Sequence, residues 1–166
     1  MSVKSFRHRG FTIIELLIYT GLVAVFLVGI MNMFLTTLDV QLESQASTSV
    51  DLDGRFIMAR LNYDLHRASQ ITAPANIGDT SASLSFVVDG NTYIYNQAGQ
   101  NLELSISGQS GILNSYGSVV PVFSVTRVGY ADGIPSVLIN LTLQSTTVLQ
   151  DHTPQSRSYQ TAVTLR

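Results

Sequence analysis

A long apolar segment near the start constrains this chain of 166 residues more than any other feature. Residues 11–31 read FTIIELLIYTGLVAVFLVGIM, and Glu15 is the only charged residue among them. About 20 apolar residues in a helix, at ~1.5 Å each, cross a membrane hydrocarbon core of about 30 Å. Three cations precede the segment, at Lys4, Arg7 and Arg9, and such flanking cations stay in the cytoplasm. The sequence therefore predicts a single-pass membrane protein with a cytoplasmic N-terminus and an extracytoplasmic globular part.

Two simpler explanations of this segment compete with any specialised function. A cleaved secretory signal has an apolar region of roughly 7 to 15 residues followed by a small-x-small cleavage site. The apolar region here is longer, and residues 34–40 offer no such site. A plain membrane anchor fits the length but leaves Glu15 unexplained, because a carboxylate at mid-helix costs roughly 2.5–3.5 kcal/mol on insertion scales. Glu15 therefore needs a partner.

The junction between Gly10 and Phe11 suggests that partner. Cleavage between these two residues would give Phe11 a free amine, four residues from Glu15 on the same helix face. Glu15 would also lie in the first turns of the helix, where the helix dipole favours a negative charge. The carboxylate could compensate the amine within one chain, or it could meet the amine of a neighbouring chain. The second arrangement would set the register between subunits.

The sequence RGFTIIELLI resembles the class III signal of type IV prepilins and type II secretion pseudopilins. The matching residues are Gly10, Phe11, Thr12 and Glu15, followed by the apolar residues from Leu16 onward. The resemblance implies that a prepilin peptidase cuts after Gly10 and methylates the new amine of Phe11. It also implies that Glu15 directs docking between subunits at an inner-membrane assembly platform, and that the helix lies in membrane lipid before assembly. The expected membrane-helix residues are Leu16, Leu17, Ile18, Leu22, Val23, Val25, Phe26 and Leu27.

Apolar residues at helical spacing continue well beyond the membrane segment. They recur every three or four residues from Leu42 to Ala68, and no proline occurs before Pro74. We expect one helix from about Phe11 to about Ser69, with a kink, or a slip in the apolar stripe, at Asp53-Gly54. Residues 1–10 would be the leader, 11–35 the membrane or filament-core half of the helix, and 36–70 its amphipathic half.

The remaining residues, 71–166, predict an antiparallel β region. Residues 70–82 form a connector, and from Ser83 the apolar period changes to two. Asp89-Gly90 is a two-residue hairpin signal, and a second turn is expected around Gly99. Residues 108–111 should break the chain again. Phe123 and Val125 should face inward. The clearest alternation is that of Val137, Ile139, Leu141 and Leu143, and a last strand with Tyr159, Val163 and Leu165 closes the chain.

These patterns indicate an α+β fold in which a long N-terminal helix packs against an antiparallel sheet of about six strands. That architecture agrees with the pilin fold that the head motif implies. Residues 54–68 and the strands that follow are similar to J-type pseudopilins and PilW-like minor pilins, although the match is looser. The resemblance implies a structural or priming minor subunit. A major pilin and a tip-located ligand-binding subunit, such as an adhesin or a DNA-uptake pilin, remain alternatives, as does an uncleaved membrane anchor.

Composition limits the other classes of function. The chain has a formal charge of −2, and removing the leader with its three cations leaves six arginines against eleven acidic residues, or −5. This charge argues against binding of nucleic acid, which requires clustered cations. The chain has no cysteine, so it forms no disulfide, unlike many pilins of the resembled family.

No catalytic or metal-binding pattern stands out, so we expect no enzyme activity and no cofactor. Three histidines share no ligand-like spacing: His8, His66 and His152. Four aspartates fall in predicted turns, where aspartate bonds to the backbone: Asp79, Asp89, Asp132 and Asp151. Asp64 is expected to form a solvated pair with Arg60 or Arg67. Core or rim packing is the favoured role for four tyrosines, with an adhesive face as the alternative: Tyr93, Tyr95, Tyr116 and Tyr130.

Overall fold

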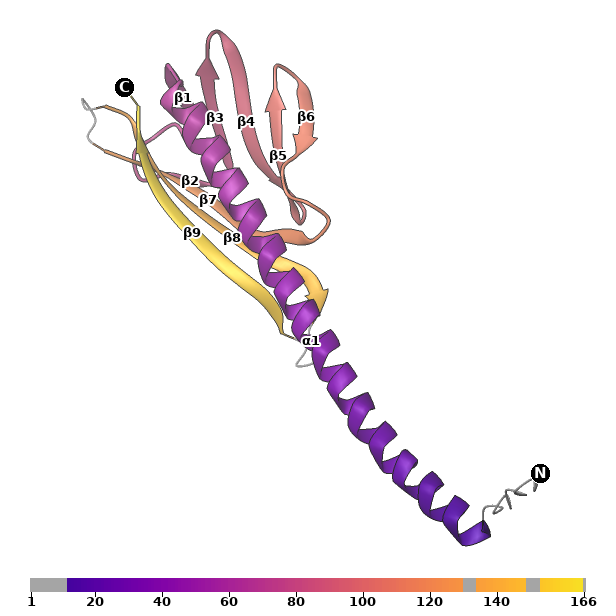
Figure 1. Cartoon of the computed structure of the whole chain (residues 1–166). Helices are drawn as coiled ribbons and strands as arrows, with labels where there is room; N and C mark the ends of the chain where they lie inside the picture. The colour runs from indigo at the N-terminus through magenta and orange to yellow at the C-terminus, as the bar shows by residue number, and fades with distance from the viewer. Residues whose placement is uncertain (1–11, 130–133, 149–152, 166) are drawn as a thin grey trace, which may run out of the picture. The chain divides into compact units, whose positions relative to one another are not determined.

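A computed structural model describes residues 12–129, 134–148 and 153–165, and it contains one long helix and nine strands (Figure 1). Helix α1 (Ile13–His66) is 54 residues long. It ends three residues before the predicted end at Ser69, and its predicted start at Phe11 lies outside the described residues. The chain divides into two compact units, residues 1–40 and 41–166, which are treated separately below.

The strands form two antiparallel sheets (Figure 1). The first sheet has the order β1-β3-β4-β5-β6, and the second has the order β2-β7-β8-β9. The first consists of β1 (Gln70–Ala73), β3 (Ser83–Val88), β4 (Asn91–Ala98), β5 (Asn101–Ile106) and β6 (Gln109–Ile112). The second consists of β2 (Thr80–Ser81), β7 (Ser118–Val128), β8 (Ser136–Val148) and β9 (Pro154–Thr164). The predicted α+β class is confirmed, but the prediction of one sheet of about six strands is wrong.

The missed strands are the short ones. β1 and β2 lie in the predicted connector at 70–82, and β6 includes most of the predicted break at 108–111. These strands contain four, two and four residues, too few to show an alternating apolar pattern. Their longer neighbours hold them by backbone pairing: β1 pairs with β3, β2 with β7, and β6 with β5.

The predicted hairpins are confirmed. β3 and β4 pair up to Val88 and Asn91, so Asp89 and Gly90 form a two-residue turn. Both have positive φ, 49° and 80°, as a type I′ turn requires. Gly99 lies in the turn between β4 and β5, with a φ of 64°.

The core of the second unit lies between α1 and both sheets. Side chains of α1 that are completely buried include Val50, Ile57, Leu61 and Leu65. They belong to one apolar cluster with residues of both sheets, including Phe123 and Val125, which the sequence predicts to face inward. Phe86 is also completely buried and stacks with Tyr93 and Tyr95 at 5.7 and 5.9 Å between ring centroids. Burial along α1 begins at Ala46, so Leu42, the first residue of the apolar series, is not covered.

Gly54 has a different role from the predicted kink, since α1 continues through it as a regular helix. A Cβ atom built at Gly54 would overlap the ring of Tyr159 on β9. The Tyr159 hydroxyl donates a hydrogen bond of 3.3 Å to Asp51, and burial together with this carboxylate raises the tyrosine pKa. Glycine at this position therefore allows β9 to approach the helix closely.

Candidate functional site

The candidate site is the first turn of α1, where Thr12 caps the helix. The Glu15 amide donates a hydrogen bond of 3.3 Å to Thr12 Oγ1, and the Leu16 amide donates one of 3.1 Å to the Thr12 carbonyl. A threonine followed three residues later by glutamate is the sequence pattern of a capping box. Glu15 thus occupies the first helical turn, as predicted. Gly10 and Phe11 lie outside the described residues.

This geometry supports two interpretations of Glu15. Its carboxylate could serve the N-terminus of the helix, where the macrodipole stabilises a negative charge by about 0.3–1 kcal/mol. It could also pair with a cation supplied from outside the first turn. The two interpretations differ in whether the charge itself is required, because glutamine replaces glutamate in a capping box.

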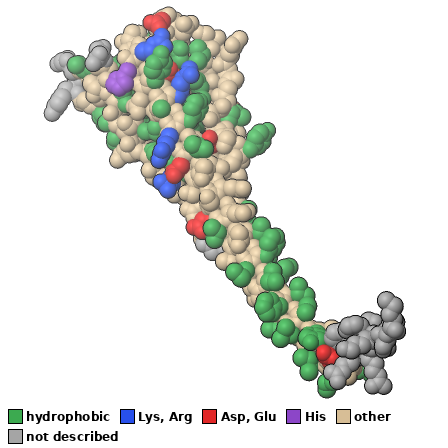
Figure 2. Space-filling model, viewed as in Figure 1, with side chains coloured by type: hydrophobic (Ala, Val, Ile, Leu, Met, Phe, Trp, Pro, Cys, Tyr) green, Lys and Arg blue, Asp and Glu red, His purple; other side chains and the backbone are tan. Residues whose placement is uncertain are grey.

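The eight predicted membrane-helix residues are all exposed, by 54 to 75% of their surface. They point in every direction around α1, so this part of the helix has no buried face. Figure 2 shows hydrophobic side chains following one another along it on the face in view. The most apolar 18-residue window of α1 has a mean hydropathy of 2.5, and α1 is the one helix of the described residues that is long and apolar enough to cross a membrane. The structure is therefore compatible with a single-pass anchor.

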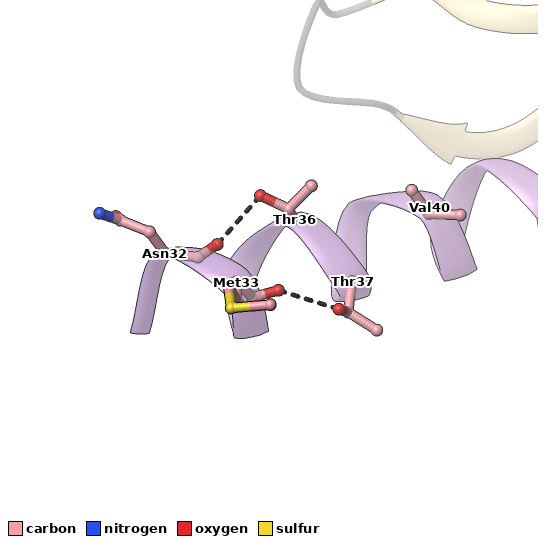
Figure 3. Close-up of a pocket in the computed structure, with 5 residues that line it drawn as sticks. All are labelled: Asn32, Met33, Thr36, Thr37 and Val40. Carbon is pink, nitrogen blue, oxygen red and sulfur yellow. Dashed lines mark hydrogen bonds between the residues drawn. The ribbon is translucent and has the colours of Figure 1, made fainter. Parts of the chain in front are cut away.

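Hydroxyl groups in this part of the helix bond back to the helix backbone. Thr20 Oγ1 donates a hydrogen bond of 2.9 Å to the Leu16 carbonyl. Thr36 and Thr37 donate hydrogen bonds of 2.9 Å to the carbonyls of Asn32 and Met33 (Figure 3). Their polar hydrogens are satisfied without water, as a hydrocarbon environment requires.

Asn32 follows the apolar segment, and its amide points away from the helix (Figure 3). Beside it lies a hollow of about 450 Å³ lined by Asn32, Met33, Thr36, Thr37 and Val40. From Ile13 to Asn32 the helix rises about 30 Å, which matches the thickness of a hydrocarbon core. Asn32 would therefore lie at the far boundary of a membrane crossed by this segment.

The environment of Asp64 differs most from the one predicted. Only 2% of its surface is exposed, so it does not form a solvated pair. Asp64 Oδ2 accepts hydrogen bonds from Arg60 Nε at 2.9 Å and from the Tyr95 hydroxyl at 2.6 Å. Arg67 pairs instead with Asp89, which is exposed in the turn between β3 and β4.

The contacts of Asp64 join α1 to β4 inside the core. Burial and the hydrogen bond to Asp64 raise the pKa of Tyr95, and the same carboxylate raises the pKa of Arg60. The sequence contained a signal for this position, because Asp64 follows Leu61 by three residues and Ile57 by seven. That spacing places it on the buried face of the helix.

The other predicted residues are dispersed. Tyr95 is buried, Tyr93 is half-buried and Tyr116 is completely exposed. Asp79 accepts hydrogen bonds from the backbone and side chain of Asn76, as a turn aspartate does. Among the described residues, no three His, Cys, Asp or Glu side chains come together in a way that could hold a metal ion. Five predicted positions lie outside the described residues: His8, Tyr130, Asp132, Asp151 and His152.

Comparisons with protein-family models, with curated proteins and with solved structures find no match for this chain. The pilin resemblance therefore depends on the residues quoted for it above, chiefly Gly10, Phe11, Thr12 and Glu15, and stays a prediction.

Proposed function

We propose that this chain is a structural or priming minor subunit of a type IV pilus or of a type II secretion-like pseudopilus. It enters the membrane as a precursor, is cleaved after Gly10 by a prepilin peptidase and is methylated on the amine of Phe11. It then leaves the lipid at an inner-membrane assembly platform and packs its apolar helix against the helices of other subunits. The part from residue 41 onward remains extracytoplasmic.

One observation carries this proposal. The capped first turn holds Glu15 at the start of α1, and the apolar side chains of the first part of that helix, from Leu16 to Leu27, are exposed on every side. Such a surface is not stable in water, and large exposed apolar surfaces mark membrane or protein contacts. Lipid would cover it before assembly, and neighbouring helices would cover it afterwards.

The charge of Glu15 has a specific part in this scheme. Two unit charges 4 Å apart attract by about 4 kcal/mol at an effective dielectric constant of about 20. A carboxylate inside a membrane span costs roughly 2.5–3.5 kcal/mol at mid-helix. A pair between Glu15 and the amine of a neighbouring Phe11 therefore offsets the cost of burying the carboxylate. Only subunits in the correct register gain this attraction.

A membrane anchor that keeps residues 1–10 is the second candidate function. The hydrogen bond from the Glu15 backbone amide to Thr12 Oγ1 favours it, because that contact forms within the chain and needs no cleavage. The Thr-x-x-Glu pattern would also give the Glu15 carboxylate a local role at the helix end.

A photo-cross-linking amino acid at Phe26 tests the proposed function. Phe26 is 67% exposed in the apolar part of α1, so its ring would contact whatever surrounds the helix. In cells with the assembly machinery we expect adducts with other subunits that carry apolar N-terminal helices. The same variant in cells without the prepilin peptidase is the control and should lose these adducts. Adducts with lipid alone, or protein adducts that do not depend on the peptidase, would contradict the proposal.

A further inference from the structure

The loop formed by residues 113–117, between β6 and β7, is held in place from several sides. Asp53 on α1 accepts hydrogen bonds at Oδ2 from the Ser115 amide at 2.9 Å and from Ser115 Oγ at 2.7 Å. The Ser118 hydroxyl donates to the same oxygen. A Cβ atom at Gly117 would lie 2.8 Å from Ser49 Oγ, so the loop also lies close against the helix.

Contacts with the strands fix the same loop further. Asn114 is 8% exposed; its Oδ1 accepts from the Leu102 amide at 2.9 Å, and its Nδ2 donates to Asn101 Oδ1 at 3.1 Å. Thr146 on β8 donates its amide to the Gly117 carbonyl at 3.1 Å and its hydroxyl to the Tyr116 carbonyl at 3.0 Å. The loop is therefore preorganised by α1, β5 and β8.

This rigid loop presents a tyrosine that is not used in packing. Tyr116 has a relative exposure of 104%, the highest of the large apolar and aromatic side chains of the described residues. By contrast, Tyr95 is completely buried in the core. A fixed backbone that holds a large aromatic ring in solvent is typical of a binding surface, since tyrosine contributes contact area at low entropic cost.

Tyr116 borders a cavity of about 460 Å³ within the second unit. This volume lies in the range of small-molecule sites. Its lining includes Asn101, Ile112, Asn114, Tyr116, Val119 and Thr146, and none of the described lining residues carries a charge. The site therefore favours a neutral ligand.

The polar groups that remain available define the ligand further. The side-chain amide nitrogen of Asn101 has no hydrogen-bond acceptor among the described residues. The Thr146 hydroxyl donates to the loop, and its oxygen can still accept a hydrogen bond. Ile112 and Val119 add aliphatic residues to the lining, and Tyr116 adds an aromatic residue whose side chain is fully exposed. A ligand that fits has hydroxyl groups around its edge and an apolar face.

We propose that this cavity binds a neutral saccharide whose sugar ring lies against Tyr116. The hydroxyl groups of the sugar would bond with the Asn101 amide and the Thr146 hydroxyl, and its C–H face would contact the tyrosine ring. The described residues that line the cavity offer no cation to a phosphorylated or acidic ligand. The main alternative ligand is an extended peptide, because β6 is an edge strand whose four residues are all exposed. A peptide paired with β6 would, however, leave the polar groups of the cavity unused.

Saturation-transfer NMR on the full chain tests this site. The chain is held in a detergent without a sugar headgroup, and the probes are the methyl glycosides of glucose, galactose, mannose and N-acetylglucosamine. We expect saturation transfer to the ring protons of at least one probe. Tyr116→Ala should weaken that binding about tenfold, whereas Tyr116→Phe should keep most of it because the ring remains. Tyr63→Ala is the matched control, since Tyr63 is also an exposed tyrosine but lies on α1, and it should leave binding unchanged.

Three results would overturn the saccharide site. They are an absence of transfer to all four probes, transfer that persists in Tyr116→Ala, and binding of N-acetylneuraminic acid or of a β-strand peptide in preference to the neutral sugars. Since the Tyr116 side chain is fully exposed, circular dichroism of its variants should match that of the original chain. The measurement uses purified protein and does not depend on filament assembly, so its failure is distinct from failure of the proposed function.

Discussion

Replacing Glu15 with alanine is expected to leave membrane insertion intact and to reduce incorporation into filaments by about tenfold or more. Loss of about 1.4 kcal/mol of docking free energy is enough for a tenfold change, and the proposed pair between charges would contribute more than that. The apolar helix becomes more hydrophobic in this variant, so insertion should not suffer. The measurement is the ratio of filament-bound to membrane-bound chain, assayed through the cross-links from Phe26.

Glu15→Gln separates the two interpretations of this residue. Glutamine can take the place of glutamate in a capping box, but it has no charge to pair with an amine. If assembly depends on the charge, Glu15→Gln should be as defective as Glu15→Ala. Near-normal incorporation of Glu15→Gln would mean that Glu15 serves the helix end, and the docking mechanism would then be wrong.

Replacing Asp64 with asparagine is expected to lower the free energy of unfolding by about 1.5–3 kcal/mol, the range for hydrogen bonds to charged groups. The change removes the buried charge that bonds to both Arg60 and Tyr95. The Tyr95 hydroxyl is inside the core and depends on this acceptor, whereas 40% of the Arg60 side chain is exposed and can turn to water. Urea unfolding of the full chain in detergent, followed by near-ultraviolet circular dichroism of the tyrosines, measures the loss.

Asp89→Asn is the matched control for that measurement. Asp89 also pairs with an arginine, Arg67, but 71% of its side chain is exposed. Exposed pairs contribute about 0–1 kcal/mol, and asparagine tolerates the positive φ of this turn position. A loss from Asp89→Asn as large as that from Asp64→Asn would contradict the view that burial makes the Asp64 contacts important.

The long elements could be predicted from sequence because their apolar periods are repeated many times. Helix α1 and strands β7 and β8 follow from such repeats, and the β3–β4 hairpin follows from Asp89-Gly90. The division into two sheets could not be predicted, because β1, β2 and β6 are defined by pairing with distant residues and not by their own patterns. Gly54 was misjudged for a similar reason: its importance depends on Tyr159, which lies far away in sequence.

The candidate site was predicted from local sequence alone. The spacing from Phe11 to Glu15 predicts the acid in the first turns of the helix, and the structure adds the capping contact with Thr12. The buried position of Asp64 was missed because an arginine four residues away suggested a surface pair. Asp64 lies on the same helix face as Ile57 and Leu61, and that apolar face is the one that becomes buried. This position on the helix was a stronger signal than the nearby arginine.

Mass spectrometry of the N-terminus of the chain isolated from its own cells tests the central claim most directly. The account predicts a chain that begins at Phe11 and carries a methyl group on the Phe11 amine. An intact chain that still begins at Met1 would contradict it, because Glu15 would then have no new amine to meet.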